Sequence, residues 1–379
     1  MIYLDNAATT KYKPERTYEA YMHYVKDVGV SPGRGSYSLG IEASRMLFQS
    51  RKTIGTYFGL QMPTNVIFTK NSTEAINLFF NGFLNKGDHV LITCYEHNAV
   101  LRPLHTLKEA GVIDYTVLSR DDVDKDGSYI LAKYGQPNTK LIATTLASNL
   151  TGRIVFNESL FKAAKEAQIT TFMDASQGAG KLRVNMQEQN IDYLAFTGHK
   201  DLMGLPGVGG LCCKEKHTIK PLIQGGTGIF GDSYTNPDSF PEGLEAGTLN
   251  MPAIWALKAS VDYCEEQFDV LHEKERALLS RLMEGLKDVP EITIYDEDAD
   301  RVSTVGFNIE NITSDKVVQY LDQNGVSVRG GIHCAILAHE ALGTVSRGVV
   351  RVSLSPFNEK EDIEEFIRII KKARESICI

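Results

Sequence analysis

Short apolar runs alternate with amphipathic stretches through the first two thirds of this chain, and that alternation constrains the fold more than any other feature. Apolar runs that predict buried strands lie at residues 65–69, 88–93, 140–145, 169–173, 191–196 and 208–213. Stretches with helical periodicity follow three of them, at residues 73–83, 98–110 and 158–168. Strands that are apolar on both faces and separated by helices require a parallel sheet covered on both sides. The sequence therefore predicts an α/β fold.

The pattern changes near residue 251. A long helical stretch is expected from residue 252 to about 287. Shorter strands are expected at residues 292–295, 302–309 and 349–354, with helices at 314–324 and 359–376. We therefore expect a large domain over 16–250 and a smaller α+β domain over 251–379, with residues 1–15 packing against the smaller one.

Composition and charge exclude several classes of protein. The net charge of −8 and the lack of a Lys/Arg block disfavour a nucleic-acid partner. The apolar stretches are far shorter than the ~20 residues that a membrane-spanning helix needs, and the first residues do not resemble a secretory signal. Six scattered cysteines without a C-x-x-C pair argue for reduced thiols. We expect a cytoplasmic globular protein.

Polar side chains follow the predicted strands at the point where each strand ends. In a parallel sheet these positions share one rim, where ligands bind. The candidates on this rim are Ser72, Thr73, His97, Asn149, Asp174, Gln177, Thr197, His199 and Lys200. Taken singly, the Ser72–Thr73 pair can be a plain helix cap and His97 a structural histidine. The histidines and Asp174 lack the spacing of a metal-ligand set.

Together, these residues match the needs of one cofactor, pyridoxal phosphate. That cofactor requires a lysine for covalent attachment and an acid to keep its ring nitrogen protonated. A helix N-terminus with hydroxyl groups suits its phosphate. Lys200, Asp174 and the Ser72–Thr73 helix start offer these three groups.

The motifs resemble those of the class V pyridoxal-phosphate enzymes of fold type I, in the cysteine desulfurase and selenocysteine lyase branch. The similar segments start at Tyr3-Leu4-Asp5-Asn6-Ala7-Ala8-Thr9-Thr10 and continue with Asn71-Ser72-Thr73-Glu74-Ala75, Glu96-His97-Asn98-Ala99, Ser148-Asn149, Met173-Asp174-Ala175-Ser176-Gln177, Thr197-Gly198-His199-Lys200, Glu245-Ala246-Gly247-Thr248 and Arg329-Gly330-Gly331-Ile332-His333-Cys334-Ala335. The resemblance covers nearly the whole chain. It implies a large domain with a mainly parallel seven-stranded sheet and a smaller C-terminal α+β domain.

The resemblance also implies roles in cofactor binding. Lys200 would hold pyridoxal phosphate covalently, and Asp174 would pair with its ring nitrogen. His97 would stack on the ring and help to move protons. Gln177 would bind the ring oxygen, and Asn149 would bind either the ring oxygen or the substrate carboxylate. The phosphate ligands would be Ser72, Thr73, Thr197 and His199, with Thr248 reaching the cofactor of the partner subunit in a homodimer.

Substrate contacts follow from the same resemblance. Arg351 would bind the substrate carboxylate, a role that suits its fork of donors, with Ala7 and Asn149 beside it. Cys334 would be the nucleophile that takes sulfur, and His333, Arg329 or the cofactor could lower its pKa. The plain alternatives are a solvated strand-end arginine and a small buried cysteine. Cys94 lies close to the rim, whereas Cys212, Cys213 and Cys378 carry no expected chemistry.

The implied activity is conversion of L-cysteine to L-alanine, with a persulfide on Cys334 that passes to an acceptor protein. A selenocysteine lyase, a class V transaminase or epimerase, and a scaffold that has lost catalysis are the alternatives. The loop from Cys334 to Arg351 is short, as in the branch with a recessed cysteine, and residues 225–242 resemble an inserted hairpin of that branch. Two departures from the family pattern are Ile336 in place of proline and Tyr37, close to Arg34, in place of histidine.

Overall fold

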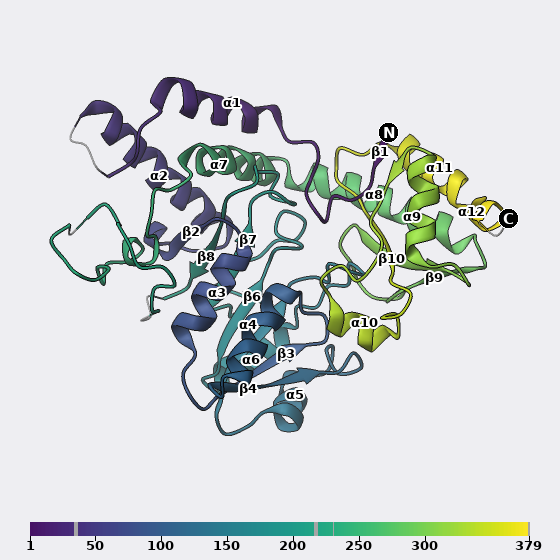
Figure 1. Ribbon diagram of the computed structural model, residues 1–379, viewed down its shortest axis with the longest axis horizontal. Helices are drawn as coiled ribbons and strands as arrows, with labels where there is room; N and C mark the ends of the chain where they lie inside the picture. Colours follow the sequence, from purple (N-terminus) through teal and green to yellow (C-terminus); the bar gives the residue numbers. More distant parts are fainter. Residues whose placement is uncertain (34–36, 216–218, 230, 378–379) are drawn as a thin grey trace.

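A computed structural model describes residues 1–33, 37–215, 219–229 and 231–377 of the protein. A large sheet and its covering helices form one part, and a smaller part holds both ends of the chain (Figure 1). The large sheet contains β2 (Val66–Thr69), β3 (Asp88–Thr93), β4 (Ile113–Leu118), β5 (Thr139–Thr145), β6 (Thr170–Asp174), β7 (Tyr193–Thr197) and β8 (Gly209–Cys213).

The order of these strands is β2-β8-β7-β6-β5-β3-β4. Strands β7, β6, β5, β3 and β4 run parallel, while β8 runs antiparallel to both β7 and β2. The prediction of an α/β fold with a mainly parallel seven-stranded sheet is confirmed. The strand β4 has no counterpart among the predicted ranges. It lies at the edge of the sheet, and its partly exposed middle residues break the continuous apolar run that marks the central strands.

Helices cover both faces of this sheet. The helices of this part are α1 (Glu15–His23), α2 (Ser38–Tyr57), α3 (Ser72–Phe83), α4 (Asn98–Glu109), α5 (Gly127–Tyr134), α6 (Glu158–Glu166) and α7 (Met251–Glu266). Alternate strand residues face opposite sides, so Ile67 belongs to the core cluster that contains residues of α3 and α4, while Val66 and Phe68 belong to the cluster that contains residues of α2, α6 and α7. The loops at the carboxyl ends of the parallel strands lead into these helices.

The smaller part is built on a three-stranded antiparallel sheet of β9 (Ile292–Ile294), β10 (Thr304–Ile309) and β12 (Val350–Ser353). Its helices are α8 (Phe268–Lys287), α9 (Ser314–Gln323), α10 (Ile336–Leu342), α11 (Lys360–Ile370) and α12 (Ala373–Ile377). The chain start contacts this part, because β1 (Ile2–Tyr3) pairs with β11 (Val326–Ser327) and Asp5 bridges to Ser353. The domain limits at residues 15 and 250 stay a prediction.

The prediction of a single helix over 252–287 is wrong. The chain turns at Gln267, whose φ of −108° and ψ of 8° end α7 and precede α8. The turn has a packing reason, because α7 lies on α1 and α2 of the large part while α8 lies on α11 of the smaller part. The helix predicted over 359–376 is likewise divided into α11 and α12.

The described residues of the 225–242 segment contain no strand, so the structure shows no hairpin among residues 225–229 and 231–242. A 3-10 turn at Glu242–Leu244 is the first regular element after β8 in the part that the structure describes. Within the described ranges, every helix is too short or too polar to cross a membrane.

Candidate active site

A cavity of about 260 Å³ lies at the carboxyl ends of the parallel strands. Its walls are Asn71, Ser72, Thr73, His97, Thr145, Asn149, Asp174, Ser176, Gln177, Thr197, His199 and Lys200. The structure thus brings together the rim residues that the sequence pattern predicted from five separate loops. Asn71, Thr145 and Ser176 join them. Ser176 could have been predicted from the sequence, because it follows Asp174 by two residues and its hydroxyl can there donate to the Asp174 carboxylate.

Asp174 and Lys200 carry the main charges of this cavity. The Asp174 carboxylate is buried, and one of its oxygens accepts from the backbone N–H of Ser176 at 3.0 Å and from the Ser176 hydroxyl at 2.5 Å. Burial lowers the pKa of Lys200, while Asp174 opposes that shift and Arg351 adds to it. The Lys200 amine is therefore shifted toward its neutral, nucleophilic form.

His97 both caps a helix and lines the cavity. Its Nδ1 accepts from the backbone N–H of Ala99 at 3.0 Å, at the start of α4. Burial lowers the pKa of His97 to about 4, so the ring is neutral at pH 7 and its proton lies on Nε2. His97 is therefore both a structural helix cap and a residue of the cavity wall.

Two buried polar atoms on the cavity wall are left without partners among the described residues. These are Thr197 Oγ1 and Asn149 Oδ1. A polar ligand bound in the cavity would give both groups a partner. The start of α3 lies on the same wall, where its first N–H groups can bind an anion. Gly209 lets β8 approach this turn, because a Cβ there would come within 2.8 Å of Asn71.

His199 is also neutral at pH 7. Burial lowers its pKa to about 4, and its Nδ1 lies 3.0 Å from the hydroxyl oxygen of Thr9. An anion on this wall would therefore meet hydroxyls, a neutral ring and helix N–H groups. These donors, the acid Asp174 and the amine Lys200 fit pyridoxal phosphate.

Cys334 opens onto an adjoining cavity of about 340 Å³, which shares Thr73 and His97 with the first. The side chain is exposed, and two hydrogen bonds hold the turn that carries it. The carbonyl of Cys334 accepts from the N–H of Asn98 at 2.8 Å, and the Asn149 amide donates to the His333 carbonyl at 2.6 Å. His333 and Cys334 both adopt left-handed φ values, 53° and 55°, which is a strained turn for two residues other than glycine.

His333 provides no positive charge beside this thiol. Burial lowers its pKa to about 3, and its Nε2 donates to the Val349 carbonyl at 2.8 Å. The structure therefore argues against the expected role of His333 in activating Cys334. The cation that lines the cavity of Cys334 among the described residues is Arg102. Burial raises the pKa of Cys94 to about 12, which makes it a poor nucleophile.

Arg351 is fully enclosed on β12. Its Nη1 donates to the Asn149 carbonyl at 2.9 Å, and its Nη2 binds Asp5 Oδ1 at 2.6 Å. The Nε atom is buried and has no partner among the described residues. Ala7 lies nearby, with its N–H donating to Ser353 Oγ at 2.8 Å and its carbonyl accepting from Gln177 Nε2 at 2.9 Å. A solvated strand-end arginine is thus excluded.

Thr248 lies apart from the Lys200 cavity. It lines two further cavities of about 560 and 300 Å³, the first of which includes His199. A buried ion pair fixes its loop, because the Arg51 guanidinium binds both oxygens of Glu245 at 2.7 and 2.5 Å. The N–H of Phe68 also donates to Glu245 at 2.6 Å. Arg51 was not among the predicted residues, and no local motif marks it.

The two departures from the family pattern, Ile336 and Tyr37, both lie at the start of a helix. Ile336 is the first residue of α10, a position where proline is also favoured, so its exchange leaves the helix start intact. Tyr37 is exposed and precedes α2. Arg34 lies outside the described residues.

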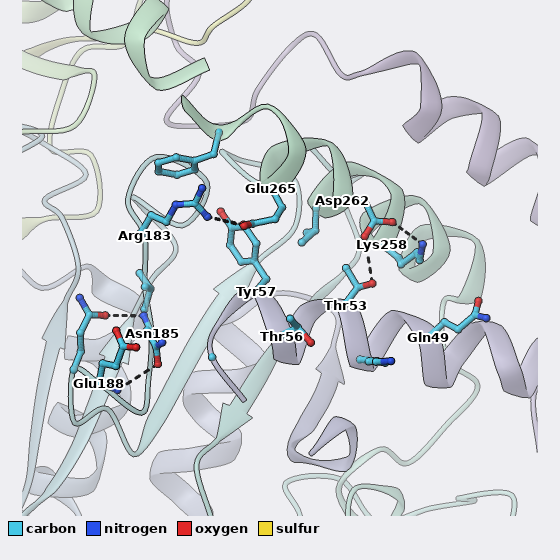
Figure 2. Close-up of a pocket in the computed structure, with 16 residues that line it drawn as sticks. Gln49, Thr53, Thr56, Tyr57, Arg183, Asn185, Glu188, Lys258, Asp262 and Glu265 are labelled. Carbon is cyan, nitrogen blue, oxygen red and sulfur yellow. Dashed lines mark hydrogen bonds and ion pairs between the residues drawn. The ribbon is translucent and has the colours of Figure 1, made fainter. Parts of the chain in front are cut away.

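A larger cavity, of about 740 Å³, lies between α2, α7 and the 183–189 loop (Figure 2). Its charged groups largely bind each other, with Arg183 on Glu265 at 2.7 Å and Lys258 on Asp262 at 2.6 Å. It contains none of the strand-end residues described above. Its size alone therefore does not identify it as an active site. Across the described ranges, no group of three or more His, Cys, Asp or Glu side chains could hold a metal ion.

Glu96, the neighbour of His97 in the chain, provides a test of protonation in the buried region beside the site. Its carboxyl is fully buried, and Oε1 accepts from the Thr93 hydroxyl at 2.7 Å and the Thr145 N–H at 3.0 Å. Burial raises the pKa of Glu96 to about 8. Between pH 5 and 8 the folded state then holds a proton that the unfolded state has lost, so stability falls as pH rises through this window.

We expect Glu96→Gln to remove this loss, because the amide stays neutral and keeps an acceptor oxygen. Urea unfolding at pH 5 and pH 8.5 should show the variant gaining on the order of 1–3 kcal/mol relative to the unsubstituted protein at the higher pH. A difference between the two proteins that does not change with pH would contradict a protonated Glu96.

Comparison with known proteins assigns the chain to a family. Residues 2–366 match the family profile described as Aminotransferase class-V. The chain belongs to this family. Among similar class V proteins is a "Probable cysteine desulfurase" of Pyrococcus abyssi, 32% identical, with 100% of this chain and 95% of that protein covered. Another of the same name, from Methanothermobacter thermautotrophicus, is 31% identical over 96% of this chain and 92% of its own length.

Solved structures of this class include a close relative in fold. The apo structure of a cysteine desulfurase from Thermococcus onnurineus NA1 superposes with a TM-score of 0.89 at 30% identity. The match covers 99% of this chain and 95% of that one. The class V fold is therefore present over essentially the whole length.

Proposed function

We propose that the protein is a pyridoxal-phosphate-dependent cysteine desulfurase, which converts L-cysteine to L-alanine and keeps the sulfur as a persulfide on Cys334. One observation carries the proposal: the Lys200 cavity and the Cys334 cavity adjoin and share His97 as a common wall. A transaminase needs the first cavity alone, whereas sulfur transfer needs an exposed thiol at its mouth. The names of the relatives support the same activity.

The cofactor would be held by residues of several loops. Lys200 would attach it covalently, Asp174 would pair with the ring nitrogen and His97 would lie on the ring face. Gln177 would bind the ring oxygen, and Asn149 would offer its orphaned Oδ1 to the ring oxygen or to substrate. The proposed phosphate ligands are Ser72, Thr73, Thr197, His199 and the partner's Thr248. When bound, the cofactor supplies an electron sink for the substrate's α-carbon.

The protein's own groups then perform the remaining steps. Arg351 binds the substrate carboxylate through its free Nε, while its Nη atoms stay on Asn149 and Asp5, and Ala7 lies beside it. The Lys200 amine removes the α-proton. The Cys334 thiolate attacks the substrate sulfur, so that an S–S bond forms as the Cβ–S bond breaks. Protons return to the carbon skeleton through Lys200, alanine leaves, and a thiol of the acceptor takes the sulfur from Cys334.

The surroundings of this chemistry also belong to the proposal. Thr248 opens onto cavities outside the Lys200 cavity, which supports a homodimer in which each chain contributes to its partner's site. Exposure of Cys334 supports transfer to an acceptor protein. All five described cysteines are free, as expected for a cytoplasmic enzyme.

A selenocysteine lyase is the second candidate, because it shares nearly every residue of this site. Selenium can leave without a protein thiol, so the exposed Cys334 favours the desulfurase. A class V transaminase would not need Cys334. A scaffold without catalysis would not retain the set of Lys200, Asp174 and Arg351.

The direct test is product analysis with the full-length protein loaded with pyridoxal phosphate. With L-cysteine and a reductant we expect equal amounts of alanine and sulfide, and an absorption band of bound cofactor before substrate is added. Slow turnover that a thiol acceptor accelerates would fit the expected acceptor step. Absence of the band, or a keto acid in place of alanine, would overturn the assignment and favour the scaffold or the transaminase.

A further inference from the structure

Lys181 is a buried cation that the chemistry above does not use. Its side chain is 6% exposed, and its ammonium donates to Ser303 Oγ at 2.6 Å and to the Leu354 carbonyl at 3.0 Å. The same Nζ atom lies 3.3 Å from Asp201 Oδ1 and 3.3 Å from Glu275 Oε1. Lys181 therefore joins four chain segments that are distant in sequence.

Two of these segments carry the proposed active-site cations. Asp201 directly follows Lys200 in the chain. Leu354 follows β12, the strand that carries Arg351, and its N–H also bonds the Ser303 carbonyl at 2.8 Å. Lys181 is thus a short bridge between the backbone that bears Lys200 and the strand that bears Arg351.

The Lys200 side of this bridge has little room to move. The Gly180 backbone, at a φ of +104°, lies so close to Asp201 that a Cβ would come within 2.2 Å of its carbonyl oxygen. The thiol of Cys264 on α7 lies 3.8 Å from the same oxygen. These contacts hold Asp201 and its neighbour Lys200 independently of the Lys181 ammonium, so loss of that ammonium is expected to displace the strand that carries Arg351.

The charges of Asp201 and Glu275 hold the Lys181 ammonium in place. Burial disfavours charge on Lys181, but Asp201 and Glu275 outweigh this and raise the pKa of Lys181, so the ammonium stays charged. Burial raises the pKa of Glu275 to about 7 even with the cation beside it. Separating these groups would leave buried charges without partners, which is costly.

We propose that Lys181 is a positioning residue that fixes the separation between Lys200 and Arg351, and so determines how tightly an amino-acid carboxylate binds. This inference rests on the proposed function. An amino acid must span from the cofactor on Lys200 to the guanidinium of Arg351, whereas the proposed cofactor contacts within this chain lie on the large-sheet rim alone. A change at Lys181 should therefore weaken amino-acid binding and spare cofactor binding.

The test compares Lys181→Met with Lys181→Arg and with a matched control, Lys258→Met. Lys258 is also ion-paired, at 2.6 Å to Asp262, but it lines the remote cavity of Figure 2. Two affinities are measured for each protein: that for pyridoxal phosphate by titration of the cofactor-free form, and that for L-alanine on the loaded form from the change in cofactor absorbance. We expect Lys181→Met to weaken L-alanine binding roughly ten- to hundred-fold, with cofactor affinity within about two-fold. Lys181→Arg should recover part of the loss, and Lys258→Met should show none.

Ser303→Ala is the milder second variant, because it removes two hydrogen bonds, one from Lys181 Nζ and one to Glu275 Oε1, and leaves the buried charges paired. It should weaken L-alanine binding several-fold without loss of folding. Unchanged L-alanine affinity in both the Met and Ser303→Ala variants would overturn the inference. A parallel loss of cofactor affinity would also overturn it, since Lys181 would then be a general structural residue. Failure of the unsubstituted protein to bind pyridoxal phosphate would instead refute the proposed function.

Discussion

Lys200→Ala is expected to reduce alanine formation from L-cysteine by roughly 10³-fold or more. The proposed roles of this lysine are to attach the cofactor and to move the α-proton, and none of the other described residues that line its cavity offers an amine. Borohydride reduction of the loaded enzyme followed by peptide mass analysis should place the added cofactor mass on the peptide with Lys200. The Ala variant should bind the cofactor without covalent attachment.

Lys13 is the group that could contradict this assignment. Its ammonium donates to the His199 carbonyl at 2.9 Å, and burial lowers its pKa to about 8, which makes it the competing amine near the site. Cofactor mass on the Lys13 peptide, or activity retained in Lys200→Ala, would refute the role of Lys200. The remote Lys258→Ala variant serves as the control for a lost lysine.

Cys334→Ala is expected to lower sulfide release from L-cysteine by at least about 10²-fold while cofactor binding is unchanged. The thiol is exposed and lies outside the wall of the cofactor cavity, so its removal leaves that cavity intact. With selenocysteine as substrate, alanine formation should survive the change, because selenium leaves without a thiol nucleophile. Product analysis with both substrates separates the two leading functions.

Cys94→Ala is the matched control for this variant. Cys94 also follows a strand of the rim, but it is buried and its pKa is raised to about 12, so activity should remain within about two-fold of the unsubstituted protein. Sulfide release that persists in Cys334→Ala and disappears in Cys94→Ala would reverse the assignment. Persistence in both variants would point to a mechanism without a protein thiol.

Much of this site could be predicted because polar residues at the ends of buried strands can be recognised in the sequence. A buried strand that ends in Asp174, or in Thr197-Gly198-His199-Lys200, puts costly polar groups at the one rim where a parallel sheet binds ligands. Arg351 could not be placed in this way, since a single arginine on a short strand has many possible environments. Its burial and its contacts with Asp5 and Asn149 depend on residues far away in the chain.

The sequence by itself determined the layered α/β fold, the rim residues and their order, because hydrophobic periodicity and strand-end polarity are local properties. Tertiary structure alone decided the break at Gln267, the neutral state of His333 and the Arg51–Glu245 pair behind Thr248. It also decided the bridge made by Lys181. These features depend on desolvation and on contacts between distant segments, and neither quantity exists until the chain has folded.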